Sequence, residues 1–489
     1  MSYLSLAFFI LLGLVMLLYY VLPKKAQWII LLAGSLCFYL FASYAALPVL
    51  ILETLVIFFL AQAMEKSSWK KGYAAGMIIL LIVVLGILMY VPGITGSLFG
   101  KTGGIVGKLI APLGISYYTL MMISYVVDLY RENIKAETNF ARLLLFALFF
   151  PAITQGPINR YAPLSVQFKT EHFFDRKEVF AGLVRFGYGA FKKMVIANRL
   201  AVFLNAVSSN EKAAGIFVLM DLILFMLQLY SDFSGCADMA IGMSRMLGIG
   251  LPENFRHPYF SRSVSEYWRR WHLTLGSWLK DYIYYPITMS PAAKRYIKNG
   301  KKNRKARIKF TACIAFFVLW LVMGIWHGPG IMFVFMGLQY AAAFIVTYLL
   351  EPVSKRFVKN HPRLEANPFW RFFQKVRTIF LLWPIFLNVT SPAQLGSFVS
   401  RIFTKFQAGK LFDGGLFKFD LDGLQWVLLL IGFVTVLVVS NIEEKKGESI
   451  VEIVLRQKLP VRIVIYWFAV IMILLSLSIQ NTEFIYAQY

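Results

Sequence analysis

The chain has 489 residues, of which 58% are hydrophobic and 15% are charged, whereas soluble domains carry about 25% charged residues. This composition excludes an ordinary soluble domain and predicts an integral membrane protein. The net charge of +25 does not indicate a nucleic-acid partner, because the excess Lys and Arg lie in short loops between apolar runs, as the positive-inside rule predicts.

Apolar runs long enough to cross a bilayer, about 20 residues each, recur from Tyr3 to near the C-terminus. We count roughly a dozen of them, which predicts an all-α polytopic membrane protein. We expect one domain over 1–489, with N-terminal helices in 1–110, a core in 111–350 and C-terminal helices in 351–489. The first run, about Tyr3 to Leu22, has no basic region before it and no small-residue cleavage pattern after it, so we expect a retained helix rather than a signal peptide.

Basic residues in the first half of the chain predict its orientation in the membrane. Lys24 and Lys25 follow the first run, which places the N-terminus outside, and the runs at 28–46 and 47–60 then return the chain to the basic "EKSSWKK". The run at 72–91 crosses outward to an external turn, "PGITGSLFGKTGG", and the run at 105–129 returns. From 141 to 180, prolines and glycines break the helical pattern, so we expect broken or re-entrant backbone, which a bilayer tolerates only inside protein or beside a wet cavity.

The strongest topological marker is the basic segment 294–309, with nine positive charges in sixteen residues and no acidic residue. It must face the cytoplasm. The run at 310–326 then climbs outward by about 25 Å, "HGPG" turns, and the run at 331–350 descends to a basic loop containing Lys355, Arg356 and Lys359. The run at 463–477 crosses last, so the C-terminal tail emerges outside.

His327, in "GIWHGPG", is the first candidate catalytic residue. The length of the preceding climb puts it in the outer half of the membrane or near the midplane, where an ionisable group is costly and indicates function. A neutral imidazole can take a proton from a hydroxyl and return it to a leaving group. The alternative is a structural one, in which His327 caps a helix end. Gly324, Gly328 and Gly330 are expected to bring backbone segments close together.

His272 lies in "RRWHLTLGSWLKDYIYY" and is the second candidate catalytic residue. Trp268, Trp271, Leu275, Trp278 and Tyr282 share approximate helical spacing, which equally fits an interfacial helix with an aromatic belt. The basic side chains of Arg269 and Arg270 are candidates for holding an anionic donor, such as the phosphates of coenzyme A.

Asp232 and Asp238 lie in the apolar segment "LQLYSDFSGCADMAIGMSRMLGI" and therefore need partners. We expect a structural pairing with Arg269 or Arg270 in preference to acid/base catalysis by the two carboxylates, and we count Asp232 among the candidate substrate-binding residues. The polar or Pro-flanked surroundings of the remaining histidines favour structural roles: His172, His257 and His361. The chain has no metalloprotease, Walker A, dinucleotide-binding or serine-hydrolase motif. The cysteines, Cys37, Cys236 and Cys313, stand far apart, so neither a disulfide framework nor a metal site is predicted.

Four segments together resemble the membrane-bound O-acyltransferase (MBOAT) family, and within it the alginate and peptidoglycan O-acetyltransferases, with the teichoic-acid D-alanylation membrane protein as a relative. These segments are "PLGISYYTLMMISYVVDLYR", "LYSDFSGCADMAIG", "ENFRHPYFSRSVSEYWRRWHLTLGSWLKDYIYYP" and "GIWHGPG". The resemblance runs from about Pro112 to Tyr340. It implies a ring of about a dozen tilted helices around a thin centre, with an outer funnel and a tunnel from the cytosol.

The resemblance also implies site residues and partners. The family's near-invariant histidine falls on His327 and its second histidine on His272. The C-terminal "FIYAQY" resembles a tail whose tyrosine, here Tyr486, takes the acyl group, although Ala487 and Tyr489 depart from the commoner Phe endings. Trp268, Trp271, Trp326, Arg269 and Arg270 fall in matching motifs and are expected to line the substrate site. We expect no bound cofactor, and acetyl-CoA or another acyl thioester as the donor from the cytosolic side.

The expected function is therefore transfer of an acetyl group across a bacterial cell membrane for O-acylation of an extracytoplasmic polysaccharide, completed by an external SGNH-type transferase. His327 would act as the general base. One alternative is D-alanyl transfer from a carrier protein to teichoic acid; the presence of "FIYAQY" within the chain favours the O-acetylating branch. A second alternative, from another class, is a transporter or flippase for a lipid-linked glycan, since broken helices and buried charge also fit that function.

Overall fold

The computed structural model describes residues 2–44, 47–99, 113–383, 389, 391–477 and 479, and within them the regular elements are helices, with no strand. Helices satisfy every backbone hydrogen bond within one segment, which long apolar runs in a bilayer require. The predicted all-α architecture is confirmed. The predicted C-terminal tail, including Tyr486, lies outside the described residues.

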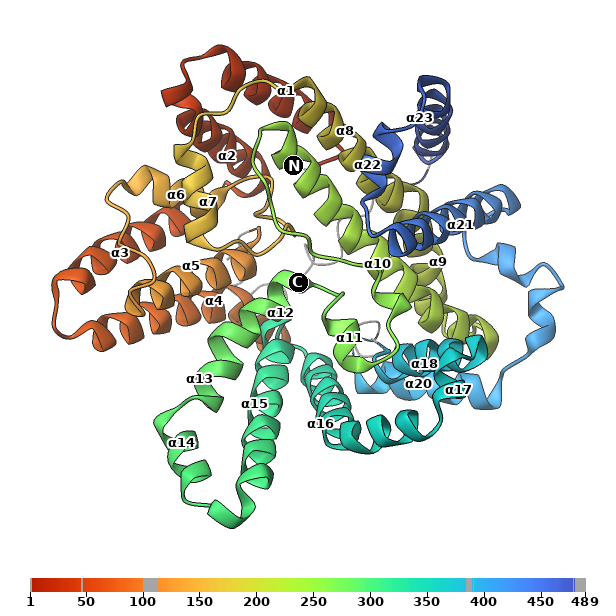
Figure 1. Ribbon diagram of the computed structural model, residues 1–489. Coiled ribbons are helices and arrows are strands. Elements are labelled where there is room, and N and C mark those ends of the chain that lie inside the picture. Colours follow the sequence, from red (N-terminus) through yellow and green to blue (C-terminus); the bar gives the residue numbers. More distant parts are fainter. Residues whose placement is uncertain are drawn as a thin grey trace. The chain divides into compact units, whose positions relative to one another are not determined.

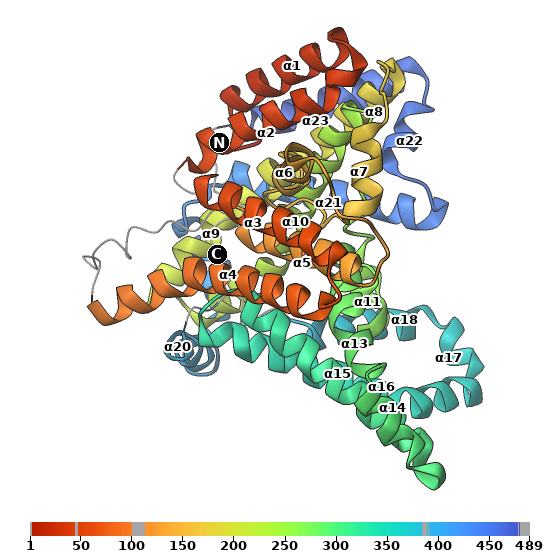
Figure 2. The same cartoon turned by 90° about the vertical axis from the view of Figure 1, so that its left-hand side faces the viewer.

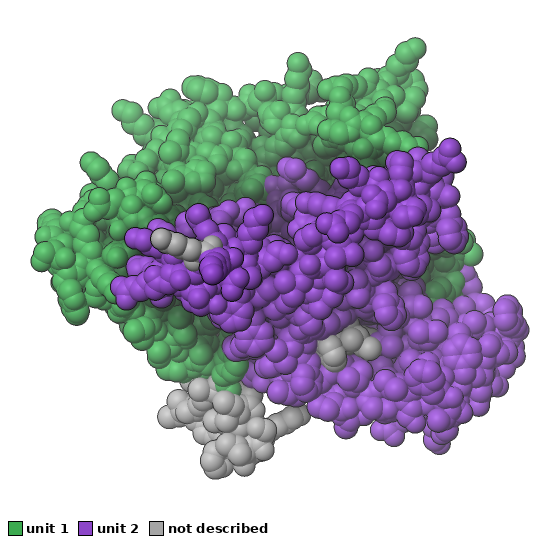
Figure 3. Space-filling view, turned by 60° about the horizontal axis from the view of Figure 1, so that its bottom comes forward, with its two compact units in different colours: residues 1–199, 228–252, 424–489 green, residues 200–227, 253–423 purple. Residues whose placement is uncertain are grey.

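The chain divides into two compact units, coloured separately in Figure 3. The first comprises 1–199, 228–252 and 424–489, and the second comprises 200–227 and 253–423. Both units combine segments that are distant in the sequence. The prediction of a single domain over 1–489 stays a prediction.

The first unit is built from helices of the N-terminal half and of the C-terminus (Figure 1). In chain order they are α1 (Leu6–Val21), η1 (Lys24–Ala26), α2 (Gln27–Ser43), α3 (Leu47–Lys66), α4 (Lys70–Phe99), α5 (Ile115–Tyr130), α6 (Phe140–Leu148), α7 (Tyr161–Lys169), α8 (Arg176–Phe191), the π-helix η3 (Lys192–Ala197), the last part of α10 (Gly215–Met246), α21 (Gly423–Lys446), α22 (Ile450–Leu455) and α23 (Leu459–Leu474).

The second unit contains the histidine motifs. Its elements are α9 (Asn198–Ser209), the first part of α10, η4 (Pro258–Phe260), α11 (Val264–Trp268), α12 (Leu273–Leu279), the π-helix η5 (Lys280–Tyr284), α13 (Tyr285–Thr288), α14 (Pro291–Lys298), η6 (Lys301–Asn303), α15 (Arg304–Trp326), α16 (Ile331–Asn360), α17 (Pro362–Ala366), α18 (Pro368–Leu381), α20 (Pro392–Thr404), η7 (Ala408–Leu411) and η8 (Gly415–Lys418). The helices α15 and α16 run side by side, and α14 lies beside the first part of α15 (Figure 1 and Figure 2).

Seven helices are long and apolar enough to cross a membrane, and α1 and α23 are shorter apolar helices. The seven are the segment from Lys24 through α2, α3, the first part of α4, α10, α15, α16 and α21. This number, taken over the residues the structure describes, is lower than the dozen counted in the sequence. The protein is a multi-pass membrane protein, as predicted.

Two predicted element ends are wrong. Helix α4 continues to Phe99, so the first part of the expected turn at 92–104 is helical; a proline within a long membrane helix is tolerated when neighbours satisfy the freed backbone groups. Helix α16 continues to Asn360, so Lys355, Arg356 and Lys359 are helical rather than in a loop. The apolar run predicts only the part of a helix that lies inside the bilayer. The charged part continues as a helix in which Lys355 pairs with Glu351 one turn earlier, at 2.7 Å.

The broken backbone predicted for 141–180 is confirmed. Between α6 and α7 the chain runs through turns at 150–156, and residues 149–159 are all buried. The Tyr3 hydroxyl donates to the Phe150 carbonyl at 2.9 Å. Gly114, at φ 73°, passes so close that an added Cβ would stand 1.9 Å from the Ile153 carbonyl oxygen. The Phe150 carbonyl therefore has a protein donor, as a buried backbone group requires.

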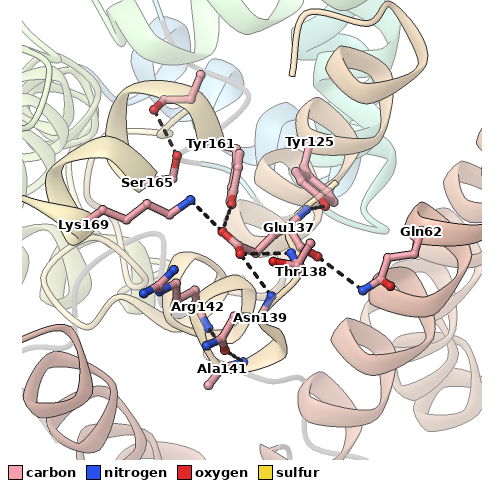
Figure 4. Close-up of polar contacts among 11 residues, drawn as sticks. Gln62, Tyr125, Glu137, Thr138, Asn139, Ala141, Arg142, Tyr161, Ser165 and Lys169 are labelled. Atoms are coloured by element: carbon pink, nitrogen blue, oxygen red, sulfur yellow. Dashed lines mark hydrogen bonds and ion pairs between the residues drawn. The ribbon is translucent and has the colours of Figure 1, made fainter. Parts of the chain in front are cut away.

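The loop between α5 and α6 is anchored by a buried carboxylate, Glu137 (Figure 4). Its Oε2 accepts from the Tyr161 hydroxyl at 2.5 Å and pairs with Lys169 at 3.1 Å. Its Oε1 accepts from the backbone N–H groups of Thr138 and Asn139, each at 3.0 Å. One side chain thus joins the start of α6 to both ends of α7.

Candidate functional site

The turn that carries His272 separates α11 from α12. The approximate helical spacing of residues 268–282 favoured an amphipathic or interfacial helix, but the structure ends α11 at Trp268, resumes as α12 at Leu273 and changes to a π-helix at Lys280. His272 itself has left-handed backbone angles, φ 44° and ψ 55°. Such a conformation is costly for a residue with a Cβ and is found where surrounding structure enforces it, commonly at functional sites.

Asn254 holds this turn in place. Its backbone carbonyl accepts from the Leu273 N–H at 3.0 Å. Its side-chain Oδ1 lies 3.1 Å from His272 Nδ1 and accepts from the Thr274 hydroxyl at 2.9 Å and from the Thr274 N–H at 3.3 Å. A second backbone bond, from Arg256 N–H to the Arg270 carbonyl at 2.8 Å, ties the same two segments together. Asn254 and His272 are both buried.

His327 lies directly after α15, at the turn into α16, and is buried. Its imidazole contacts the Trp326 ring edge-on, with centroids 5.0 Å apart, and lies nearly parallel to the Phe333 ring at 6.1 Å. The predicted "HGPG" turn is confirmed. His327 follows the last turn of α15, where its backbone N–H donates to the Gly324 carbonyl at 3.2 Å.

Small residues let α15 and α16 approach closely beside His327. A Cβ added to Gly324 would stand 2.5 Å from the Phe333 carbonyl oxygen, and one added to Gly337 would stand 2.6 Å from the Trp320 carbonyl oxygen. Both obstacles are backbone atoms, which cannot rotate aside. The close approach predicted for Gly324 is confirmed, and it fixes the turn in which His327 lies.

The structure brings the two candidate histidines into electrostatic range of each other. Burial, and secondarily the nearby His327, lower the pKa of His272 well below its ordinary value. His272 is therefore neutral at pH 7. A neutral imidazole is able to accept a proton, which an imidazolium is not.

The two predicted substrate-site tryptophans on the α11 turn have packing partners. Trp268, half-buried, lies against the Trp320 ring at 4.3 Å and the Tyr340 ring at 5.2 Å. Trp271 is buried, stacks on Tyr267 at 5.7 Å and meets Phe255 edge-on at 5.1 Å. This aromatic packing supports the turn; contact of either residue with substrate stays a prediction.

The two arginines on the same turn differ in exposure. Arg270 is half-buried and pairs with Glu266 one turn earlier, at 2.9 Å. Arg269 is exposed and donates to the Ser265 hydroxyl at 3.1 Å. Binding of an anionic donor by these side chains stays a prediction.

Asp232 and Asp238 lie on α10, within the first unit, and are buried. Asp232 pairs with Lys193 at 2.6 Å. Asp238 is held between Arg185, at 2.6 Å, and Lys192. Both carboxylates therefore have buried cationic partners, as their apolar surroundings demand, but the partners come from α8 and η3 instead of the expected Arg269 and Arg270.

Sequence reasoning did not single out Asn254, Arg185, Lys192 or Lys193. The lysines and arginine stand in a run of mixed composition, "VRFGYGAFKKMV", that lacks a clear span signal. Asn254 lies in "ENFRHPY", eighteen residues from His272 in sequence. A buried asparagine gives no periodic signal, so only coordinates bring the two together.

Two buried histidines at helix breaks define a candidate site in this polytopic all-α protein, and comparison with known proteins assigns its class. The model of the membrane-bound O-acyltransferase family matches residues 4–374. The chain belongs to this family, and the predicted resemblance is confirmed.

Three members of the family illustrate which kinds of acyltransferase the chain is similar to. The chain is 31% identical to "Probable alginate O-acetylase AlgI" of Pseudomonas fluorescens over 65% of this chain and 60% of that protein. It is 30% identical to the peptidoglycan O-acetyltransferase of Helicobacter pylori over 71% of this chain and 70% of that protein. It is 30% identical to the teichoic acid D-alanyltransferase of Bacillus subtilis over 51% of this chain and 62% of that protein. The matches with the first and third relatives thus span less than two thirds of those proteins.

Proposed function

We propose that the protein is an O-acyltransferase that passes an acetyl group from acetyl-CoA across the membrane for O-acylation of an extracytoplasmic polysaccharide. The observation that carries the proposal is the proximity of two buried imidazoles, His272 and His327, at helix breaks in a protein of this family. The names of the three relatives support it, since each describes acetyl or alanyl transfer to a polymer.

In the proposed reaction His327 is the general base. It takes the proton of an acceptor hydroxyl as the oxygen attacks the thioester carbonyl carbon and forms the new C–O bond. The C–S bond then breaks, and the thiolate of coenzyme A receives the proton from the imidazolium. The step is balanced without any further reactant. In this proposal the donor stays on the cytosolic side, and only the acyl group moves outward.

The charge distribution supports a cytosolic donor. The exposed basic residues of α14 and the start of α15 mark the cytoplasmic face by the positive-inside rule, and α15 rises from them by about 34 Å to His327. Both termini are then extracytoplasmic in a bacterial cell membrane. The acceptor hydroxyl belongs to Tyr486, to an external SGNH-type transferase or to the glycan itself.

The test supplies acetyl-CoA labelled in its acetyl group to the purified protein in proteoliposomes and follows label on protein and on added glycan. His327→Ala should abolish transfer while the protein still elutes as a single folded species. His361→Ala is the matched control, because His361 is exposed, directly follows α16, and its imidazole Nδ1 lies 2.9 Å from the Phe357 carbonyl near the end of that helix. Full transfer by His327→Ala removes the base assignment.

The same assay distinguishes the proposed function from its two alternatives. Label transferred from a D-alanyl carrier protein, and not from acetyl-CoA, indicates D-alanylation, which the relative from Bacillus subtilis makes the second candidate. Movement of an unmodified lipid-linked glycan with no covalent label indicates a transporter.

A further inference from the structure

The buried residue beside His272 has a definite hydrogen-bonding polarity. Asn254 Oδ1 lies 3.3 Å from the backbone N–H of Thr274, and a backbone N–H only donates. The atom facing it must therefore be the amide oxygen and not the amide nitrogen. This contact settles which way the Asn254 amide points, because its oxygen and nitrogen are told apart by their hydrogen-bond partners.

The orientation of the amide fixes the proton on His272. The same Oδ1 lies 3.1 Å from His272 Nδ1. An amide oxygen only accepts, so Nδ1 must carry the hydrogen and donate it. In a neutral imidazole the other nitrogen, Nε2, then carries the lone pair in the ring plane and is the acceptor.

We propose that Asn254 is a positioning residue for acyl transfer, which holds His272 as the Nδ1–H tautomer in its left-handed turn and so leaves Nε2 as the basic nitrogen. The inference rests on the proposed function for its link to catalysis. His272 Nε2 thus provides a second proton-accepting position beside the His327 base. Asn254 acts through His272 and is not itself expected to touch substrate.

Three features of Asn254 support a positioning role. It is fully buried, so its bonds are not exchanged with solvent. Its backbone carbonyl and its side chain both hold the segment 272–274. Finally, the strained angles of His272 are maintained by these bonds, as expected for a residue whose orientation matters.

The direct test is nitrogen NMR of the full-length protein in detergent micelles with ¹⁵N-labelled histidine. The chain has five histidines, and His272→Gln identifies the His272 signals. The wild type should show protonated Nδ1 and unprotonated Nε2. In Asn254→Ala the two tautomers should mix, whereas Thr274→Val, which removes another donor to Oδ1 but leaves the bond to His272, should keep the wild-type pattern. A wild-type His272 protonated at Nε2 overturns the proposal.

The kinetic test separates positioning from simple folding. Asn254→Ala should lower kcat by about 10- to 100-fold, a typical loss for an orienting partner of histidine, with little change in KM for the thioester. Asn254→Asp keeps the acceptor oxygen and adds a negative charge beside Nδ1–H, so it should restore most of the activity. That charge raises the pKa of His272 against the opposing effect of His327, and the loss of activity on acidification should begin about 1 unit higher in pH or more.

The outcomes separate this inference from the proposed function. Equal inactivity of Asn254→Asp and Asn254→Ala in folded protein, with wild-type histidine signals in both, contradicts a positioning role. Full transfer by His327→Ala together with the expected His272 tautomer overturns the base assignment and leaves the tautomer assignment standing.

Discussion

Replacing Asp232 should reveal a structural ion pair in the first unit. Its carboxylate lies 2.6 Å from Lys193 Nζ, and the two side chains are only 2% and 3% exposed. Asp232→Asn would leave the lysine ammonium buried without its counter-charge. Removing one partner of a buried pair costs about 3–5 kcal/mol, a change of at least about a hundredfold in the folding equilibrium at 1.4 kcal/mol per factor of ten.

The double variant Asp232→Asn/Lys193→Met tests whether the cost comes from the unpaired charge. With both charges gone, stability should return to within about 1–2 kcal/mol of wild type, the remaining cost being that of a buried amide. Unfolding is measured by SDS titration in mixed micelles. Glu178→Gln is the control, because its ion pair with Arg245 is exposed and should contribute less than about 1 kcal/mol.

Two results would refute this reasoning. Asp232→Asn could be as stable as wild type, or the double variant could lose the sum of the two single losses, which would exclude coupling between the charges. The predicted substrate contact of Asp232 is tested at the same time: a double variant that recovers stability without acyl transfer indicates a role in substrate binding, and one that recovers both indicates a structural pair.

Two further predictions follow from close packing and from the Glu137 anchor. Gly324→Ala should lower stability by about 1–3 kcal/mol, because the new Cβ meets the Phe333 carbonyl, whereas Gly76→Ala, with nothing within 4 Å, should be neutral or stabilising by up to about 1 kcal/mol; equal thermal midpoints for the two variants would contradict the packing argument. Burial alone would raise the pKa of Glu137, but hydrogen bonds from Tyr161 and the Asn139 N–H, with Lys169, outweigh it and hold the pKa below its ordinary value. The carboxylate therefore stabilises the fold above the ordinary Glu pKa, and this contribution is lost as pH falls through the folded-state value. Thermal midpoints at pH 7 and pH 4 should converge between wild type and Glu137→Gln on acidification; a constant difference would refute it.

The apolar helices could be predicted from the sequence because their signal is local. Runs of about 20 apolar residues gave α2, α3, α15 and the first part of α16, and basic segments gave a consistent orientation. The ends of two helices were predicted wrongly because their last residues do not have the composition of a membrane helix. The continuation of α16 through Lys355 is charged, and that of α4 through 92–99 is rich in Gly and contains Pro.

The candidate site could be predicted only in part. His272 and His327 were found because an imidazole in apolar surroundings is unusual, and because the family's two histidines fall on these positions. The break of the predicted 268–282 helix at His272 was missed, since aromatic residues at helical spacing continue through the turn. The partners of Asp232 and Asp238 were missed because pairing between distant segments depends on how α8, η3 and α10 pack, which no single run of sequence encodes.

The π-helical turn η3 places two consecutive lysines against carboxylates six positions apart on α10, Lys193 on Asp232 and Lys192 on Asp238. A wide turn of this kind contains one residue more than an α-helical turn. Deleting a single residue there would convert the wide turn into an ordinary α-helical one, and the two lysines would no longer both face Asp232 and Asp238. Homologous chains should therefore tolerate changes of side chain in this turn more readily than changes in its length.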